Sequence, residues 1–268
     1  MTEALDALAP YRLAREPFYQ ASADEVERFE AAFSQRLPLL LKGPTGCGKS
    51  RFIEHMAWRL QLPLVTVACH EDLSAGDLVG RWLLDGEGTR WQDGPLTAPA
   101  RFGAICYLDE LVEAHADTTV VIHPLTDTRG MLPLAQRNEL VHAHADFDVV
   151  VSYNPSPMAR ELKSWTRQRF CALEFGYTEP EREAAIVAHE SGLELARAAA
   201  IVGFGLRTRR LQGHGLDEGA STRMLVHAAA LQVAGLSVVS ACRMAVVDAL
   251  SDERGVHEAL VAALDASF

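Results

Sequence analysis

The chain lacks the cysteine pattern of a secreted or zinc-binding protein, and it has no long apolar run. Its 268 residues include five cysteines, which are scattered and never stand in C-x-x-C spacing. A disulfide framework or a zinc site is therefore not expected. No stretch is apolar for the length of a membrane span, and the N-terminus shows no signal segment. These absences predict a cytoplasmic protein without a membrane span.

Positive charge is also scarce. Lysine and arginine together number 25 against 36 aspartates and glutamates, so the formal net charge is −11. A protein that binds DNA or RNA through the phosphates needs a basic surface. We therefore expect no nucleic-acid partner, and a nucleic-acid translocase is disfavoured.

What the chain does have is one dense glycine-rich segment. The motif G-x-x-x-x-G-K-[ST] is matched without a gap by Gly43, Pro44, Thr45, Gly46, Cys47, Gly48, Lys49 and Ser50. Glycine lets backbone amides turn inward around an anion, Lys49 can reach the outer phosphates, and the Ser50 hydroxyl can bind magnesium. An apolar run precedes the segment and a helical pattern follows it. The segment therefore predicts a phosphate-binding loop for ATP and Mg²⁺.

Polar side chains follow two further predicted strands. Asp109 and Glu110 end an apolar run, and Asn154 follows another. Asp109 can hold magnesium through water, and Glu110 can act as the general base toward the attacking water. Asn154 can orient that water. A solvent-facing acidic pair and a simple Asn-Pro turn are the alternatives.

Three arginines are further candidates. Arg167 and Arg169 stand just before the last predicted strand, and either can stabilise charge on the γ-phosphate of a neighbouring subunit. Arg223 lies in the first turn of a predicted helix that Ser221 can cap, from which it can face phosphate. Solvated surface charge is the alternative for each arginine.

Strand and helix patterns alternate in the first two thirds of the chain. Such alternation predicts an α/β fold with a parallel sheet. The first helix is expected to be capped by Ser22, with Glu25 three residues on. The expected strands are 37–41, 63–69, 104–109, 147–153 and 171–175.

Beyond about residue 178 only alanine-rich helical patterns remain. We therefore expect an N-terminal arm at 1–20, an α/β nucleotide-binding domain at 21–178 and a small all-α lid domain at 179–268. Trp82 and Trp91 flank two glycines in segment 80–95, which predicts a hairpin. Its tryptophans either present an aromatic surface to a partner or pack back on the sheet.

Together these segments resemble the AAA+ ATPases, more narrowly the MoxR group and its CbbQ/NorQ family, and most closely the CbbQ branch. The resemblance rests on "LLLKGPTGCGKSRFIEHMAWRL", "DGPLTAPARFGAICYLDE", "VSYNP", "TRQRF" and "EGASTRML". It implies homo-hexameric rings that hydrolyse ATP and remodel a client protein through an adaptor with a von Willebrand factor A domain. Segments 80–95 and 127–146 look like the insertions of the MoxR group.

The resemblance also implies roles for the candidate residues. Gly43 to Ser50 would be the phosphate loop, Asp109 and Glu110 the Walker B pair, and Asn154 the first sensor. Either Arg167 or Arg169 would be the arginine finger. Arg223 would be the second sensor.

Several functions remain open. The resemblance implies inhibited Rubisco as the client in the CbbQ branch and nitric oxide reductase, during maturation, in the NorQ branch. A P-loop kinase acting on a small molecule is an alternative of another class, which Asp109, Glu110, Asn154 and Arg223 disfavour. A GTPase would carry N-K-x-D, which is absent.

Overall fold

The computed structural model describes residues 7–86, 88–155, 162–213 and 215–268. The chain forms two compact units, which we describe separately. The first comprises the described residues up to Lys42 together with Lys49–Glu174. The second comprises Gly43–Gly48 and Phe175–Phe268.

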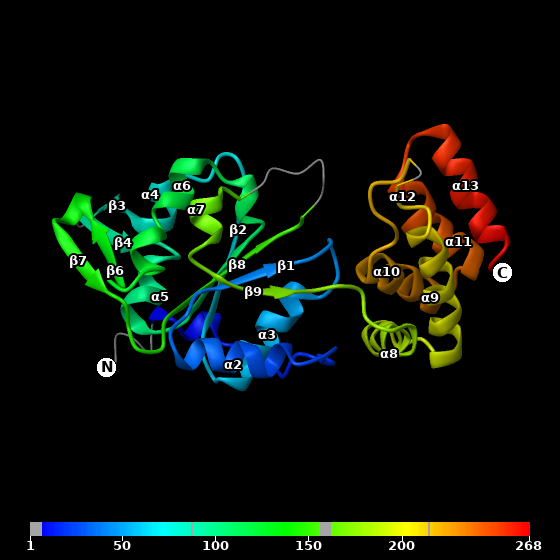
Figure 1. Cartoon of the computed structure of the whole chain (residues 1–268), viewed down its shortest axis with the longest axis horizontal. Coiled ribbons are helices and arrows are strands. Elements are labelled where there is room, and N and C mark those ends of the chain that lie inside the picture. The colour runs from blue at the N-terminus through cyan, green and yellow to red at the C-terminus, as the bar shows by residue number, and fades with distance from the viewer. Residues whose placement is uncertain (1–6, 87, 156–161, 214) are drawn as a thin grey trace. The chain divides into compact units, whose positions relative to one another are not determined.

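The first unit is built on a five-stranded parallel sheet in the order β2-β5-β8-β1-β9 (Figure 1). Because every neighbouring pair is parallel, the carboxyl ends of all the strands lie at one edge, where ligands bind in such sheets. The predicted α/β class is confirmed. The strands are β1 (Leu39–Lys42), β2 (Leu64–Ala68), β5 (Ile105–Asp109), β8 (Asp148–Tyr153) and β9 (Cys171–Glu174).

Helices cover both faces of this sheet. Leu40, Cys106 and Val151 belong to a core on one face that also contains Leu78 and Leu96. Strand alternation directs the intervening side chains to the other face, where α2 and α3 lie together (Figure 1). The helical segments of this unit are η1 (Ala9–Tyr11), α2 (Glu25–Ser34), α3 (Lys49–Arg59), α4 (Ala75–Val79), α5 (Thr97–Phe102), η2 (Leu111–Glu113), α6 (Ala116–Val120), η3 (His123–Leu125), η4 (Ala135–Arg137) and α7 (Ser164–Arg167).

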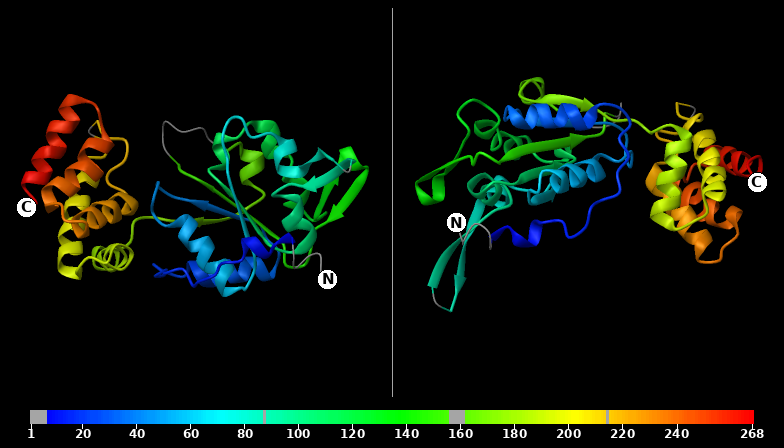
Figure 2. Two further views of the ribbon diagram at one scale, coloured as in Figure 1. Left: turned by 180° about the vertical axis from the view of Figure 1, so that it is seen from behind. Right: turned by 90° about the horizontal axis from the view of Figure 1, so that it is seen from below.

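Two antiparallel hairpins extend from the first unit. One pairs β3 (Gly80–Asp85) with β4 (Gly88–Asp93), and the other pairs β6 (Met131–Leu134) with β7 (Glu139–His142). They fall in the two segments expected to be insertions. The β3–β4 hairpin projects away from the sheet in the right-hand view of Figure 2.

The predicted cap of the first helix is wrong. Helix α2 begins at Glu25 with Asp24 as the N-cap residue, and no side chain caps it. Instead the Glu25 carboxylate accepts hydrogen bonds from the Ser22 and Ala23 amides at 2.6 and 2.8 Å. The Tyr19 hydroxyl also donates to it, at 2.7 Å. The glutamate half of the capping arrangement therefore forms without the serine half.

The second unit is helical beyond the phosphate loop. Its core includes Val187, Phe204, Leu225, Val246 and Leu260, all fully buried. One expected helix is interrupted by a π-helical turn at Arg243–Val247. The helices are α8 (Pro180–Ser191), α9 (Leu195–Arg209), α10 (Thr222–Val233), α11 (Val238–Cys242), α12 (Asp248–Leu250) and α13 (Arg254–Asp265).

Within the described ranges, no helix has the length and apolar character to cross a membrane.

Candidate functional site

The glycine-rich segment joins the end of β1 to the start of α3. Gly46 and Gly48 have φ angles of 68° and 103°, which glycine adopts without strain. The Thr45 carbonyl accepts a hydrogen bond from the Tyr177 hydroxyl at 3.1 Å. A Cβ placed on Gly46 would lie 2.8 Å from the Ser221 Cβ, so only glycine fits there. Lys49 begins α3 and is 8% exposed.

Arg223 lies beside the same loop, within the second unit. The Ser221 side chain accepts from the Met224 amide and caps α10, as the sequence predicts. The Arg223 Cβ would lie 3.5 Å from a Cβ placed on Gly46. Its side chain is exposed, so its position is compatible with a contact to bound phosphate.

Five side chains and amides meet where β5 and β8 end beside α3. The Tyr107 hydroxyl donates to Asp109 Oδ1 at 2.6 Å and lies 3.4 Å from Ser50 Oγ. The Ser152 hydroxyl donates to the same Asp109 oxygen at 2.5 Å and accepts from the Glu110 amide at 3.1 Å. The sequence analysis identified Ser50, Asp109 and Glu110 but missed Tyr107 and Ser152.

This group of oxygen atoms fits magnesium. Mg²⁺ prefers hard oxygen ligands and keeps several waters. The Ser50 hydroxyl and the Asp109 carboxylate are such ligands, and Tyr107 holds them near each other. Burial and the Asp109 charge raise the pKa of Tyr107, so its hydroxyl stays protonated at neutral pH.

The neighbouring Cys69 thiol is not an anionic ligand. Burial, followed by the charges of Asp109 and Glu110, raises the pKa of Cys69 to about 12. Cys69 is therefore neutral at physiological pH.

Glu110 and Asn154 follow the ends of neighbouring parallel strands. Glu110 is exposed and comes directly after β5. Asn154 is partly buried and comes directly after β8. Because β5 pairs with β8, both residues lie at the same edge of the sheet as Asp109. The structure therefore brings the expected base and first sensor to one region.

The two candidate finger arginines have different surroundings. Arg169 lies 3.7 Å from Asp127 Oδ2 and donates to the His123 carbonyl at 3.4 Å. Arg167 ends α7 and is exposed, with no ion pair to another described residue. Arg169 is thus held within its own chain, whereas the Arg167 guanidinium is accessible to a second molecule.

Comparison with known families covers both units. Residues 38–170 match the AAA domain of the dynein-related subfamily, and residues 183–267 match the CbbQ/NirQ/NorQ C-terminal domain. The chain is 56% identical to "Protein CbbQ" of Hydrogenophilus thermoluteolus, over 98% of this chain and 100% of that protein. The chain belongs to the CbbQ/NorQ family of AAA+ ATPases.

Other relatives of this CbbQ/NorQ-family ATPase carry different names. "Protein NorQ" of Paracoccus denitrificans is 52% identical over 91% of both chains. "Denitrification regulatory protein NirQ" of Pseudomonas aeruginosa is 51% identical over 93% of this chain and 96% of that protein. Sequence similarity is therefore high to more than one branch.

Solved structures support the fold alone. A putative ATPase of Cytophaga hutchinsonii matches with a TM-score of 0.55 at 14% identity, over 97% of this chain and 84% of that one. A mutant of RuvB from Thermotoga maritima matches with a TM-score of 0.54 at 17% identity, over 88% and 66% of the two chains.

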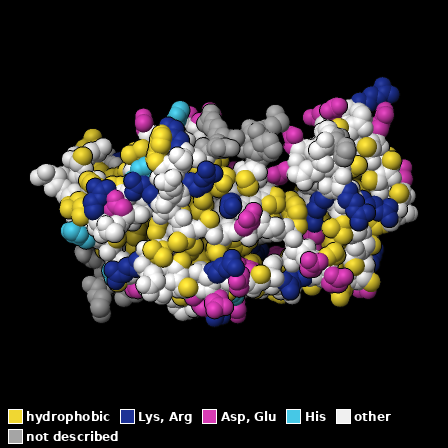
Figure 3. All heavy atoms as spheres, in the orientation of Figure 1, with side chains coloured by type: hydrophobic (Ala, Val, Ile, Leu, Met, Phe, Trp, Pro, Cys, Tyr) yellow, Lys and Arg dark blue, Asp and Glu magenta, His cyan; other side chains and the backbone are white. Residues whose placement is uncertain are grey.

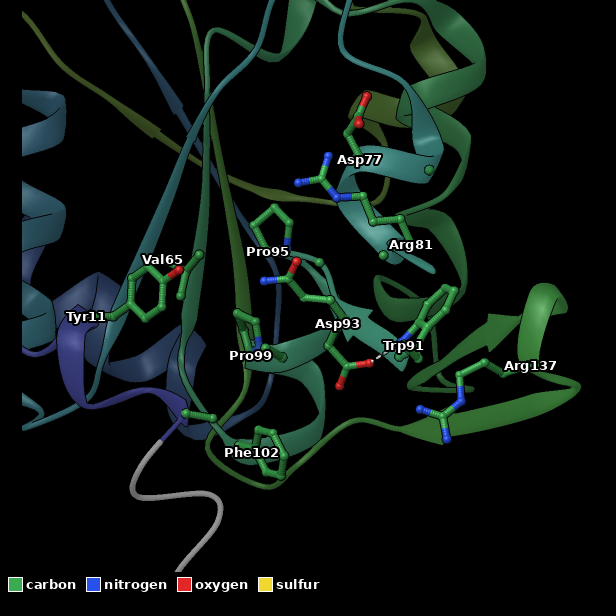
Figure 4. Close-up of a pocket in the computed structure, with 16 residues that line it drawn as sticks. Tyr11, Val65, Asp77, Arg81, Trp91, Asp93, Pro95, Pro99, Phe102 and Arg137 are labelled. Carbon is green, nitrogen blue, oxygen red and sulfur yellow. Dashed lines mark hydrogen bonds between the residues drawn. The ribbon is translucent and has the colours of Figure 1, made fainter. Parts of the chain in front are cut away.

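The β3–β4 hairpin of this ATPase places its two tryptophans opposite each other. Trp82 and Trp91 pair across the strands, with ring centroids 5.5 Å apart. The Trp91 indole donates to Asp93 at 2.7 Å, and Arg137 lies over its ring (Figure 4). Trp82 is 48% exposed and Leu84 is 84% exposed. Trp91 therefore stabilises the hairpin, and Leu84 and Trp82 form its accessible surface.

A cavity of about 670 Å³ lies against this hairpin (Figure 4). Its lining includes Tyr11, Arg81, Trp91 and Phe102. Asp93 also lines it, but the Asp93 carboxylate is already bound by Trp91 and Arg101. The lining is of mixed charge and does not select one class of ligand.

Basic and acidic side chains both occur on the face of the molecule that Figure 3 shows. On the face seen in Figure 3, arginine and lysine side chains lie among acidic and apolar ones over the first unit, and several basic side chains lie together on the helical unit.

Proposed function

We propose that this CbbQ/NorQ-family ATPase is a ring-forming motor that reactivates inhibited Rubisco with a von Willebrand factor A domain adaptor. The single observation that carries the client is the 56% identity, over the full length, to a relative named CbbQ. The link between that branch and Rubisco is the one implied by the family resemblance. The site residues supply the chemistry that such a motor needs.

The phosphate loop and Lys49 would bind the phosphates of ATP. Loop amides and a fixed cation are the usual means of holding them. Ser50 and Asp109 would hold Mg²⁺, which when bound neutralises charge on the β- and γ-phosphates. Glu110 would accept a proton from the attacking water, and Asn154 would orient that water.

Arg223 and Arg167 would complete the site, one within its own chain and one in a neighbouring subunit. Arg223, beside Gly46, would contact phosphate within its own chain. Arg167, exposed at the end of α7, would reach the γ-phosphate bound by a neighbouring subunit. AAA+ proteins are typically oligomeric, and we propose a homo-hexamer.

The test is reactivation of Rubisco carrying an inhibitory sugar phosphate. The purified chain, its adaptor and ATP should restore carboxylation, and Lys49→Ala should abolish both ATP turnover and reactivation. Lys49→Ala with full ATPase activity would contradict the phosphate-loop assignment. Active ATPase without any reactivation would contradict the Rubisco assignment.

Maturation of nitric oxide reductase is the second candidate. The relatives named NorQ and NirQ are 52% and 51% identical, close to the value for CbbQ. Complementation of a strain lacking its own NorQ protein, scored by nitric oxide reductase activity, distinguishes this candidate from the first.

A further inference from the structure

A chain of hydrogen bonds runs from α3 to the backbone of Glu110. Tyr107 donates its single proton to Asp109 Oδ1, so Ser50 must be the donor in its 3.4 Å contact with the Tyr107 oxygen. Ser152 donates to the same Asp109 oxygen and accepts from the Glu110 amide. Donors and acceptors are thus matched from Ser50 through Tyr107, Asp109 and Ser152 to Glu110.

We propose that Tyr107 and Ser152 are positioning residues for this site. Tyr107 orients the two magnesium ligands, and Ser152 fixes Asp109 relative to the backbone of the catalytic base. This inference rests on the proposed roles of Ser50, Asp109 and Glu110.

The burial of both hydroxyls supports a specific role. Tyr107 is 1% exposed and Ser152 is fully buried, and each has an apolar residue on either side of it in its strand. A buried hydroxyl costs stability unless it is hydrogen-bonded. Phenylalanine and alanine would fill these positions without that cost. The hydroxyls are therefore explained by the partners that they hold.

The arrangement leaves each expected ligand open toward the metal. Both donors converge on Oδ1 of Asp109, and no described group donates to its Oδ2. With Ser50 as the donor to Tyr107, the lone pairs of the serine oxygen remain for a cation. Hydrogen bonds that orient metal ligands in this way typically change metal affinity about 10–100-fold when removed.

Ser152 also supports an uncommon backbone conformation. Glu110 has a φ of 55°, in the left-handed region that costs energy for residues other than glycine. The hydrogen bond from its amide to Ser152 helps to hold that conformation. The side chain of Glu110 is exposed in this geometry, as a base facing a substrate water must be.

The role of Tyr107 is tested by measuring how much Mg²⁺ strengthens the binding of nucleotide. The Kd of a fluorescent, non-hydrolysable ATP analogue is measured with EDTA and with saturating Mg²⁺, and the ratio gives the coupling. Tyr107→Phe should leave the Kd in EDTA unchanged and reduce the ratio roughly 10-fold. A wild-type ratio in Tyr107→Phe would overturn the proposal.

Two variants separate this outcome from failure of the site itself. Tyr153→Phe removes a hydroxyl from the adjacent strand, one with no hydrogen bond to another described residue, and should keep the wild-type ratio. Asp109→Asn should lower the ratio at least as much as Tyr107→Phe. If Asp109→Asn leaves the ratio unchanged, the assignment of the metal site is wrong.

Ser152 is tested by kinetics. Ser152→Ala should reduce kcat roughly 10-fold, on the scale typical of such supporting partners. The KM for ATP should change little, because the phosphate loop is untouched. An unchanged kcat, or a KM that rises as much as kcat falls, would overturn the positioning role.

Discussion

Glu110 shows at the scale of one residue how the fold presents a reactive group. It follows a buried strand directly, its backbone is left-handed, and its carboxylate is exposed. Neighbouring Asp109 is instead bound by two buried hydroxyls. The adjacent acids therefore have different surroundings, which suits one to hold a metal and the other to accept a proton.

Glu110→Gln should bind ATP and hydrolyse it about 10²–10⁴-fold more slowly, the usual contribution of a positioned general base. Glutamine keeps the size of the side chain but cannot accept the proton of the water. Steady-state ATPase assays and analogue binding measure the two effects separately. If nucleotide binding is lost as well, Glu110 has a structural role instead.

The sequence predicted only part of this cluster. The positions of Ser50, Asp109 and Glu110 follow from a motif and from the end of an apolar run. Tyr107 was detectable, because side chains two residues apart in a strand share a face and Tyr107 therefore lies on the side of Asp109. Ser152 was not, because its contact depends on the register between β5 and β8.

The different surroundings of Arg167 and Arg169 also became visible only in the structure. The sequence places both arginines just before a strand and does not show which of them forms an ion pair. The partner of Arg169 is Asp127, which lies in a distant segment, so only tertiary structure shows that Arg169 is engaged.

At the scale of elements, the predicted strands agree closely with the observed ones. The interval expected at 104–109 is observed as Ile105–Asp109, and that at 147–153 as Asp148–Tyr153. Short apolar runs bounded by turn residues are a strong signal for buried strands. Helix α2 was placed too early because the Ser22 side chain does not cap it, although the Glu25 carboxylate does bind the Ser22 and Ala23 amides.

The β3–β4 hairpin is the element that we expect to contact the partner. Leu84→Ser removes its most exposed apolar side chain and should keep basal ATPase activity and the melting temperature, while Rubisco reactivation falls. Leu195→Ser, which changes another exposed leucine on α9, is the matched control and should keep reactivation. Normal reactivation by Leu84→Ser would exclude this surface from the mechanism.

Trp91 should behave differently from Leu84. Because its ring packs against Trp82 and its indole binds Asp93, Trp91→Ala should lower the melting temperature together with activity.

The helical unit depends on one buried ion pair. Glu183 is fully buried and accepts from Arg209 at 2.6 and 2.8 Å and from Thr222 at 2.6 Å, which joins α8, α9 and α10. Glu183→Ala leaves the Arg209 charge unpaired and should destabilise the unit by about 3–5 kcal/mol. Urea unfolding followed by circular dichroism measures this loss.

Glu258→Ala is the control for that prediction. Glu258 pairs with Arg254 on an exposed helix face, where ion pairs contribute little. A similar effect of both substitutions would show that the buried pair has no special role.

At the scale of the whole molecule, the α/β class and the helical region were predictable because periodicity differs between strands and helices. The strand order was not, since β1 lies between β8 and β9, which are distant from it in sequence. Assembly was implied only by the resemblance. Arg167 is exposed, whereas Arg169 is bound to Asp127 and the His123 carbonyl. We therefore predict that Arg167 is the arginine that reaches a neighbouring subunit.

Arg167 should act across the subunit interface. Arg167→Ala should reduce turnover by a factor on the order of 10³ while each subunit keeps its affinity for ATP, because an arginine finger contacts the transition state of a neighbouring site. Arg169→Ala should instead lower the melting temperature, since Arg169 holds the His123 carbonyl and Asp127.

Mixing experiments distinguish action in trans from action in cis. A ring that contains Arg167→Ala and Lys49→Ala subunits has some sites with an intact Lys49 facing an intact Arg167. At equal proportions about a quarter of the interfaces in a cyclic assembly have this arrangement, so part of the ATPase activity should return. Mixing Lys49→Ala with Glu110→Gln provides the control, because both groups belong to one subunit's site and no interface is complete. If activity stays at the level of the separate variants at every ratio, Arg167 does not act in trans.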